Sequence, residues 1–212
     1  MGVANVGSFA IPHIYADDDP SSTPQDDYLV TVNLSDSYGG IAPGQNLNVT
    51  ITNVPPNLFM GVAKVVPEGQ PYTDTLSFFD VNADTWIGMV NYNDGSPIAN
   101  ATVNPTTKTV ELNHTYPTNG IYNIAVLVRD DDLGETIRYK DVIVGLKLNV
   151  APVAPNNVRL SWASVFPGMM VQTTTNFTDW TYLSNTPQLV GSEYRVTVPR
   201  TNPAAFFRLN RP

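Results

Sequence analysis

Aspartates dominate the side chains that could do chemistry in this chain of 212 residues, which has no cysteine and only two histidines. Calcium takes about six to eight oxygen ligands from carboxylates and backbone carbonyls, and acidic turns of β-domains supply both. The aspartates gather near the start of the chain and again in its middle. The sequence therefore predicts calcium ligands in two clusters, namely Asp17, Asp18, Asp19, Asp26 and Asp27, and Asp130, Asp131 and Asp132.

The same clusters also fit a second interpretation. Acidic side chains in a turn, with Glu135 extending the second cluster, keep a protein surface hydrated and soluble without binding any ion. Neither interpretation excludes the other at the level of sequence.

Common catalytic motifs are missing from the sequence. The sequence contains no Gly-x-Ser-x-Gly elbow, no His-Glu-x-x-His pair and no glycine-rich phosphate loop. A catalytic site would have to be a carboxylate pair or a calcium-bound water in the acidic clusters, assisted by His13. The alternative to a non-catalytic protein is therefore a small calcium-assisted hydrolase of esters, lactones or glycosides.

The elements that carry these aspartates are predicted to be strands. Apolar residues alternate with others along 121–128, and the run ends at three aspartates and Gly134, which is the pattern of a half-buried strand. Fourteen glycines and eighteen prolines indicate many turns, and no stretch of about ten residues has helical periodicity. The predicted fold class is all-β.

Segments 84–96 and 110–134 closely resemble the PKD repeat (polycystic kidney disease domain), an immunoglobulin-like β-sandwich common in bacterial extracellular proteins. Asn93 stands where that family usually has a glycine. The resemblance implies a PKD-like sandwich over 55–150, and some members of the family are stabilised by calcium. The matching residues are Trp86 and the turn Asn91 to Gly95; His114, Thr115 and Tyr116; and Gly120, Tyr122, Asp130, Asp131 and Asp132.

Residues 9–40 repeat the design of 110–134 at an offset of 94 residues, as from Tyr28 to Tyr122. Only eight residues precede this first copy, so 1–54 would be the C-terminal half of a PKD-like unit. A half sandwich exposes apolar faces and strand edges. We therefore expect it to be completed by another part of the chain, by other modules of a longer chain or by a second copy.

A third pattern follows a predicted proline-containing linker at 151–157. Five apolar segments within 158–210 predict a small C-terminal β-module over 151–212. It resembles an all-β module of secreted proteins of environmental bacteria, on Leu160, Ser161 and Trp162; on Gln172, Thr174, Thr175, Asn176, Phe177 and Trp180; and on Phe206, Phe207, Arg208 and Leu209.

The histidines and the aromatic residues have structural interpretations as well as functional ones. His13 and His114 fall at the same repeat position, so we expect their rings to pack locally rather than to form a metal or catalytic pair. The tryptophans are expected in cores. Exposed rings that could stack on a carbohydrate are predicted at Tyr38, Tyr72 and Tyr182.

Charge and hydropathy limit the partners. A net charge of −8 argues against nucleic acid, and no apolar run approaches the length needed for membrane insertion. The first residues do not begin a signal peptide, so we expect a removed leader or a fragment of a longer protein. The favoured interpretation is a non-catalytic extracellular or cell-surface region of a bacterial protein that binds carbohydrate or protein, or acts as a spacer.

Overall fold

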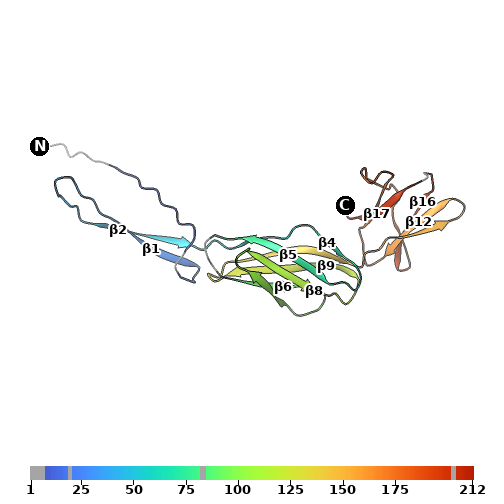
Figure 1. Cartoon of the computed structure of the whole chain (residues 1–212), viewed down its shortest axis with the longest axis horizontal. Helices are drawn as coiled ribbons and strands as arrows, with labels where there is room; N and C mark the ends of the chain where they lie inside the picture. The colour runs from blue at the N-terminus through green and yellow to red at the C-terminus, as the bar shows by residue number, and fades with distance from the viewer. Residues whose placement is uncertain (1–7, 19–20, 82–84, 202–203) are drawn as a thin grey trace.

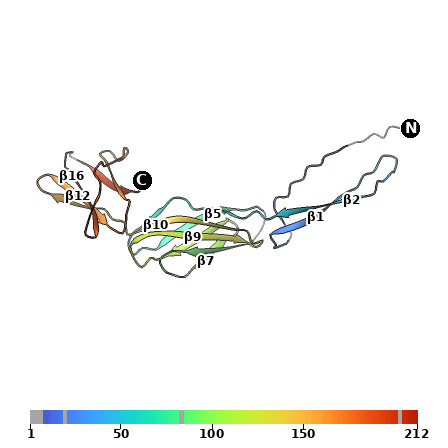
Figure 2. The ribbon, with the colours of Figure 1, turned by 180° about the vertical axis from the view of Figure 1, so that it is seen from behind.

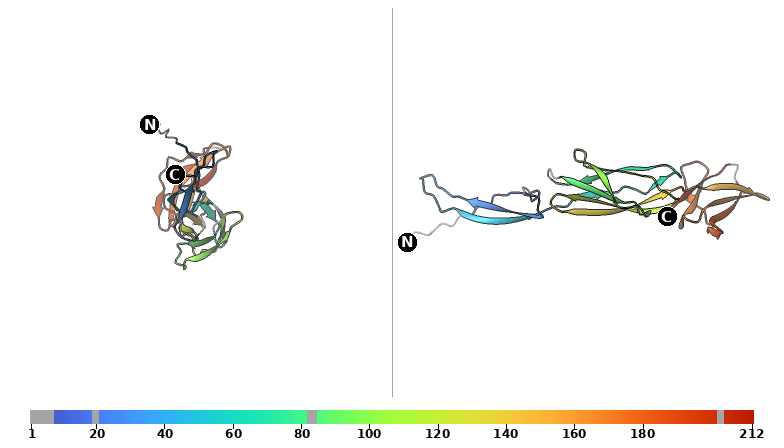
Figure 3. Two further views of the ribbon diagram at one scale, coloured as in Figure 1. Left: turned by 90° about the vertical axis from the view of Figure 1, so that its left-hand side faces the viewer. Right: turned by 90° about the horizontal axis from the view of Figure 1, so that it is seen from below.

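The computed structural model describes residues 8–18, 21–81, 85–201 and 204–212, and every statement below concerns these residues. Seventeen strands form three units that lie end to end, with the first unit at one end of the row (Figure 1; Figure 3). The described residues include no helix long and apolar enough to cross a membrane. The all-β prediction is confirmed.

The first unit is a two-stranded antiparallel hairpin. Its strands pair along their whole length, from Gln25 opposite Thr52 to Val32 opposite Gln45. No third described strand joins this sheet, so both faces and both edges of the hairpin are open. The strands are β1 (Gln25–Val32) and β2 (Gln45–Thr52).

The central unit contains eight strands in two layers. One layer has the order β3-β5-β8-β7 and the other the order β6-β9-β10-β4, with β7 pairing across to β6. The paired strands β9 and β10 lie side by side in Figure 2. The strands are β3 (Asn57–Phe59), β4 (Lys64–Val66), β5 (Tyr72–Phe79), β6 (Trp86–Asn91), β7 (Ala99–Asn104), β8 (Thr109–His114), β9 (Gly120–Asp130) and β10 (Glu135–Val144).

This strand order defines an immunoglobulin-like β-sandwich. In chain order the strands correspond to A, B, C, D, E, F and G, with A, B, E and D in one sheet and C, F and G in the other, while β4 adds a parallel strand beside β10. The Tyr122 hydroxyl, near the start of β9, donates to the Thr118 carbonyl oxygen at 2.8 Å. Such a tyrosine corner is a hallmark of this fold.

The sandwich core forms from the inward positions of β9 and the strands that face it. Ile124, Val126 and Val128 are fully buried, as are Val110 and Val142. Burying an aliphatic side chain of this size contributes roughly 1.5–3 kcal/mol, so the alternation read from the sequence supplies the main stabilisation of the domain.

The His-Thr-Tyr and Tyr-x-Asp-Gly segments meet at one end of the sandwich. The His114 ring stacks on Tyr92 with centroids 4.0 Å apart, and its Nε2 lies 2.7 Å from Asp94 Oδ2. Burial would raise the pKa of Asp94, but hydrogen bonds from Ser96 and His114 hold this pKa at about 2. Asn93, which replaces the usual glycine, has a φ of 57°, the left-handed conformation that asparagine tolerates. The expected local packing of His114 is confirmed.

A buried ion pair crosses the same sandwich. Lys140 Nζ lies 2.5 Å from Asp74 Oδ2, and the Lys140 side chain is only 6% exposed. Lys64 approaches the other oxygen of Asp74 at 3.4 Å, but its side chain is 42% exposed. The Tyr72 hydroxyl also donates to Asp74. Lys140 therefore depends on Asp74 for compensation of its charge.

The C-terminal unit consists of two small sheets with the orders β11-β12-β16-β15 and β14-β13-β17. Trp162 and Phe166 are buried between them, as expected for a core tryptophan. The strands are β11 (Asn149–Val153), β12 (Asn157–Ala163), β13 (Met170–Thr174), β14 (Thr181–Tyr182), β15 (Gln188–Val190), β16 (Glu193–Pro199) and β17 (Phe206–Asn210).

The predicted linker at 151–157 is wrong. Strand β11 pairs with β12 from Asn149 to Val153, so the predicted boundary at 150/151 falls inside a strand. Pro152 is accommodated because β11 lies at the edge of its sheet, where a missing N–H leaves no neighbour unpaired. The last two units are also joined by apolar contacts, since Ile121 and Ile143 belong to the hydrophobic cluster around Trp162.

Replacing Lys140 by alanine should lower the free energy of unfolding of the central domain by about 3 kcal/mol, because Asp74 loses its buried partner. Lys64→Ala is the matched control and should cost less than about 1 kcal/mol, since Lys64 is largely solvated. Hydrogen exchange of the β9 amides measures the change within this domain alone. Equal effects of the two substitutions would contradict the assignment.

A carboxylate cluster at the junction of the first two units

The segment that precedes β1 folds back onto the turn between β9 and β10. The Ser22 hydroxyl donates to Asp131 at 3.3 Å, and the Thr23 backbone N–H donates to the Asp132 carboxylate. The Val54 N–H, just after β2, donates to Asp17 Oδ1 at 2.9 Å. The structure thus brings the two ends of the hairpin unit and the acidic turn of the central domain to one place.

Asp130 is the most fully bonded carboxylate at this junction. Its Oδ1 accepts the Gly134 N–H at 2.6 Å, and both its oxygens accept from Asn53 Nδ2 at 3.1 and 3.2 Å. A Cβ on Gly134 would lie 2.4 Å from Asn53 Nδ2 and 2.5 Å from Asp130 Oδ2, so a larger residue here would displace the side chains that make these bonds.

Several oxygens at the junction have no partner. Asp18 is fully buried, and Asp17 and Asp132 are each 4% exposed. Yet no hydrogen bond within the described structure reaches Asp17 Oδ2, either oxygen of Asp18, Asp132 Oδ1 or Asn53 Oδ1. A buried acceptor without a donor costs free energy, and a buried carboxylate costs more, so these oxygens form an acceptor-rich site that lacks positive charge.

The electrostatics agree with this description. Burial raises the pKa of Asp18 to about 6, and the charges of Asp132 and Asp17 act in the same direction. Burial also raises the pKa of Asp132 and of Asp130, and neighbouring carboxylates add to both shifts. The site therefore favours protons or another cation over empty, ionised carboxylates.

The predicted calcium ligands divide into two groups. Asp17, Asp18, Asp130, Asp131 and Asp132 meet at the junction, whereas Asp26 and Asp27 belong to β1 and accept from Ser21 and Thr50 beside them. Asp19 lies outside the described residues. In the described part of the chain, no three His, Cys, Asp or Glu side chains are already gathered closely enough to hold a metal ion.

Sequence reasoning missed two polar residues of this region. Asn53, the first residue after β2, contributes an unpartnered amide oxygen, and nothing in its sequence neighbourhood marks it as a ligand. Asp80 is 4% exposed, accepts from Trp86 Nε1 at 2.6 Å and has its pKa raised by burial and by Asp130. It stands alone in the sequence, and only folding places it near the acidic turn.

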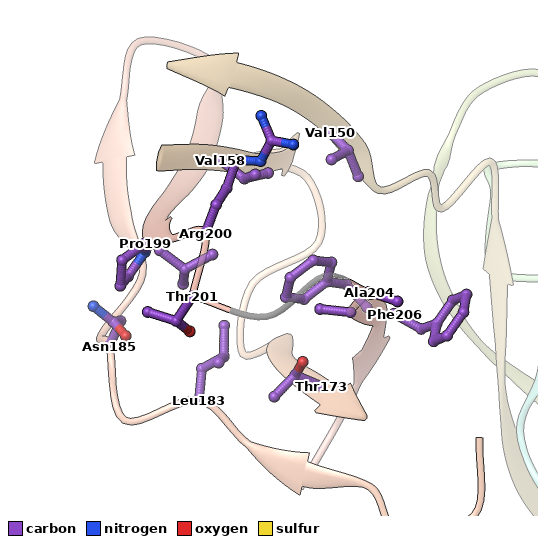
Figure 4. Close-up of a pocket in the computed structure, with 13 residues that line it drawn as sticks. Val150, Val158, Thr173, Leu183, Asn185, Pro199, Arg200, Thr201, Ala204 and Phe206 are labelled. Atoms are coloured by element: carbon purple, nitrogen blue, oxygen red, sulfur yellow. The ribbon is translucent and has the colours of Figure 1, made fainter. Parts of the chain in front are cut away.

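The other candidate sites have simpler roles. His13 packs edge-on against Tyr15 at 4.3 Å, so each histidine contacts its own copy of the motif. Tyr72 is fully buried, so its prediction as an exposed ring is wrong, whereas Tyr38 and Tyr182 are 96% and 45% exposed. A mainly apolar cavity of about 650 Å³ lies in the C-terminal unit, where Val158, Leu183 and Phe206 are among its lining residues (Figure 4).

No family model matches the chain, and no curated protein is similar to it in sequence. Solved structures match it at low similarity. They include titin domains Z1Z2 in complex with telethonin (14% identity, TM-score 0.34, 72% of this chain and 85% of that one), titin domains A168–A170 (14%, 0.33, 87% and 68%) and a marsupial T cell receptor (13%, 0.31, 74% and 94%). The immunoglobulin-like assignment rests on the strand order.

In chelator, the melting temperature should fall as the pH rises from about 5 to about 7.5. The folded pKa of Asp18 lies above its ordinary value of 3.8, so its stabilisation is complete below that value and is lost as pH rises through about 6. Asp18→Asn should flatten the profile and raise the melting temperature near pH 7.5, as calorimetry can measure. Superimposable profiles for the variant and the parent would rule out this role of Asp18.

Proposed function

We propose that this chain is a non-catalytic spacer or binding region of a secreted or surface bacterial protein, in which calcium stiffens the junction between the hairpin unit and the immunoglobulin-like domain. One observation carries the proposal. Buried carboxylate oxygens from two separate units meet at the junction without hydrogen-bond donors or cationic partners in the described structure.

The donor set fits calcium. Carboxylate and amide oxygens are the ligands that this ion prefers, and its coordination tolerates irregular geometry. Asp17, Asp18 and Asp132 would hold the ion, with the Asn53 amide oxygen beside them. Because these side chains do not yet form a coordination sphere, binding would draw them together and would fix the hairpin unit against the turn. The bound ion would neutralise the charges that raise the pKa of Asp18.

The arrangement of the units supports a spacer. They lie in a row rather than around a shared core (Figure 1). At the far end, Ile121 and Ile143 join the apolar cluster of the C-terminal unit, and Arg211 bonds to Asp141 at 2.6 Å. The polar junction near Asp130 is therefore the place where an ion would decide how stiff the row is.

The extracellular location rests on the PKD-like motifs and on the chemistry of the site. Domains that bind calcium outside cells work with dissociation constants of about 10⁻⁴–10⁻³ M. Such weak binding suits a site whose ligands are brought together only when the ion binds. The PKD-like interpretation is supported by the contacts of Tyr92, Asp94 and His114, because those residues carry the resemblance and pack on one another.

The burial of the cluster favours structural over catalytic use. A metal-assisted hydrolase needs an open coordination position that substrate can reach. Asp18 is fully buried and Asp17 and Asp132 are nearly so, which suits an enclosed ion.

Isothermal titration with calcium chloride at pH 7.5 tests the proposal. The parent chain should bind calcium, and Asp132→Ala should weaken binding at least about tenfold because an unpartnered ligand is lost. Asp27→Asn is the matched control, since this aspartate was predicted as a ligand from sequence but bonds to Thr50 on the hairpin. It should bind calcium like the parent.

Small-angle scattering of the same proteins measures stiffness. Calcium should narrow the distribution of maximum dimensions for the parent and for Asp27→Asn but not for Asp132→Ala. Absence of binding heat together with an unchanged melting temperature in chelator would refute the calcium site. Binding without any change in the scattering profile would refute the stiffening role.

A further inference from the structure

The hairpin unit has the local structure of the second half of the immunoglobulin-like domain. In the β9–β10 turn, the Asp130 N–H donates to the Gly134 carbonyl oxygen at 3.0 Å, and the Gly134 N–H donates to Asp130 Oδ1 at 2.6 Å. In the β1–β2 turn, Asp36 and Gly40 make the same two bonds at 2.9 and 2.7 Å. The two turns coincide at the offset of 94 residues that relates the sequences.

The aromatic contacts repeat as well. His114 meets Tyr116 edge-on at 4.7 Å, and Tyr116 stacks on Tyr122 at 4.2 Å. His13 likewise meets Tyr15 at 4.3 Å, and Tyr15 contacts Tyr28 at 4.7 Å. The hairpin unit therefore presents the ring series of the complete domain in the same order.

The burial of equivalent residues differs sharply. Val126 and Val128 on β9 are fully buried, whereas their counterparts Val32 and Leu34 are 37% and 59% exposed. In the complete domain β9 pairs with β6 through Val90 opposite Val126, but β1 has no described neighbour on that edge. The hairpin thus has an apolar face and a strand edge suited to a partner shaped like the first half of this domain.

We propose that the hairpin unit binds a polypeptide segment that folds like strands β3 to β8 and carries an aromatic-x-Asp-Gly turn. The need for an aromatic-x-Asp-Gly turn in the docking segment is inferred from His13. In the complete domain the equivalent histidine stacks on Tyr92 and bonds to Asp94, both of which come from the β6–β7 turn. The segment that docks supplies such a ring and carboxylate to His13 and adds a strand to the free edge of β1.

The hairpin unit has Leu47 where the complete domain has Lys140, and this difference specifies one residue of the docking segment. Lys140 lies opposite Ile124 and requires Asp74 from β5, whereas the residue opposite Val30 is Leu47. An acid facing Leu47 would be buried without a partner. The docking segment therefore has an apolar residue where β5 has Asp74.

A second copy of this chain fits the surface less well. Two hairpins could cover each other's apolar faces, but neither would bring a counterpart of Tyr92 and Asp94 to His13, because the chain's own turn is occupied by His114. The inference does not depend on calcium, since the docking face lies along β1 and β2 rather than at the junction.

A chimera of the full chain tests the proposal. A second copy of residues 57–113, with Asp74→Leu in the added copy, is joined directly in front of His13. Completion of the sandwich should slow hydrogen exchange in β1 and β2 at least about tenfold relative to the present chain. The chimera that keeps the added Asp74 should show less protection. Both results are expected in calcium and in chelator, so failure of the calcium site leaves this test intact.

Two substitutions sharpen the test. Val32→Ala and His13→Ala should leave the melting temperature of the present chain unchanged but lower that of the completed chimera by several degrees, because only there are these side chains covered. Unprotected β1 and β2 amides in both chimeras would overturn the proposal. So would a dimer of the present chain, seen by sedimentation, in which those amides are already protected.

Discussion

The hydrogen bond from the Gly134 N–H to the Asp130 carboxylate is the interaction on which the two N-terminal units depend. It closes the turn between β9 and β10, two strands that pair in the register that keeps Ile124, Val126 and Val128 on the buried face. The same carboxylate accepts from Asn53, so the turn that organises the sandwich also holds the end of the hairpin unit. Beside it, Asp132 and Asp17 are buried, and each has an oxygen without a hydrogen-bond donor.

The two junctions between the units bury different kinds of groups. Between the last two units, apolar side chains such as Ile143 are removed from water, and this association needs no ion. Between the first two, charged oxygens are removed from water, which is unfavourable unless protons or a cation compensate them. The first junction can therefore respond to its surroundings, because its stability changes with pH and with ion concentration, whereas the second is largely indifferent to both.

Sequence reasoning succeeded where the signal is local. The alternation along 121–128 predicted β9. The offset of 94 residues predicted that 9–40 repeats the design of 110–134, and Asp36 and Gly40 do make the turn bonds of Asp130 and Gly134. It failed where partners are distant. Asp17 and Asp27 both stand in an acidic part of the sequence. In the fold, Asp17 is buried at the junction and accepts from Val54, whereas Asp27 lies on β1 and accepts from Thr50. Strand β11 was missed because its prolines indicate a linker unless the strand is known to lie at a sheet edge.

The two proposals act on one small element and are therefore linked. A two-stranded hairpin is marginal in water on its own, so ordering β1 and β2 carries an entropic cost that the first ligand to bind must meet. If the docking segment orders the hairpin, calcium no longer has to, and its apparent affinity rises; by reciprocity, calcium strengthens docking by the same factor. An ion bound at the junction would then strengthen the completion of the first domain without being required for it. Calcium binding at the junction and docking on the hairpin would then be coupled equilibria, each able to occur without the other.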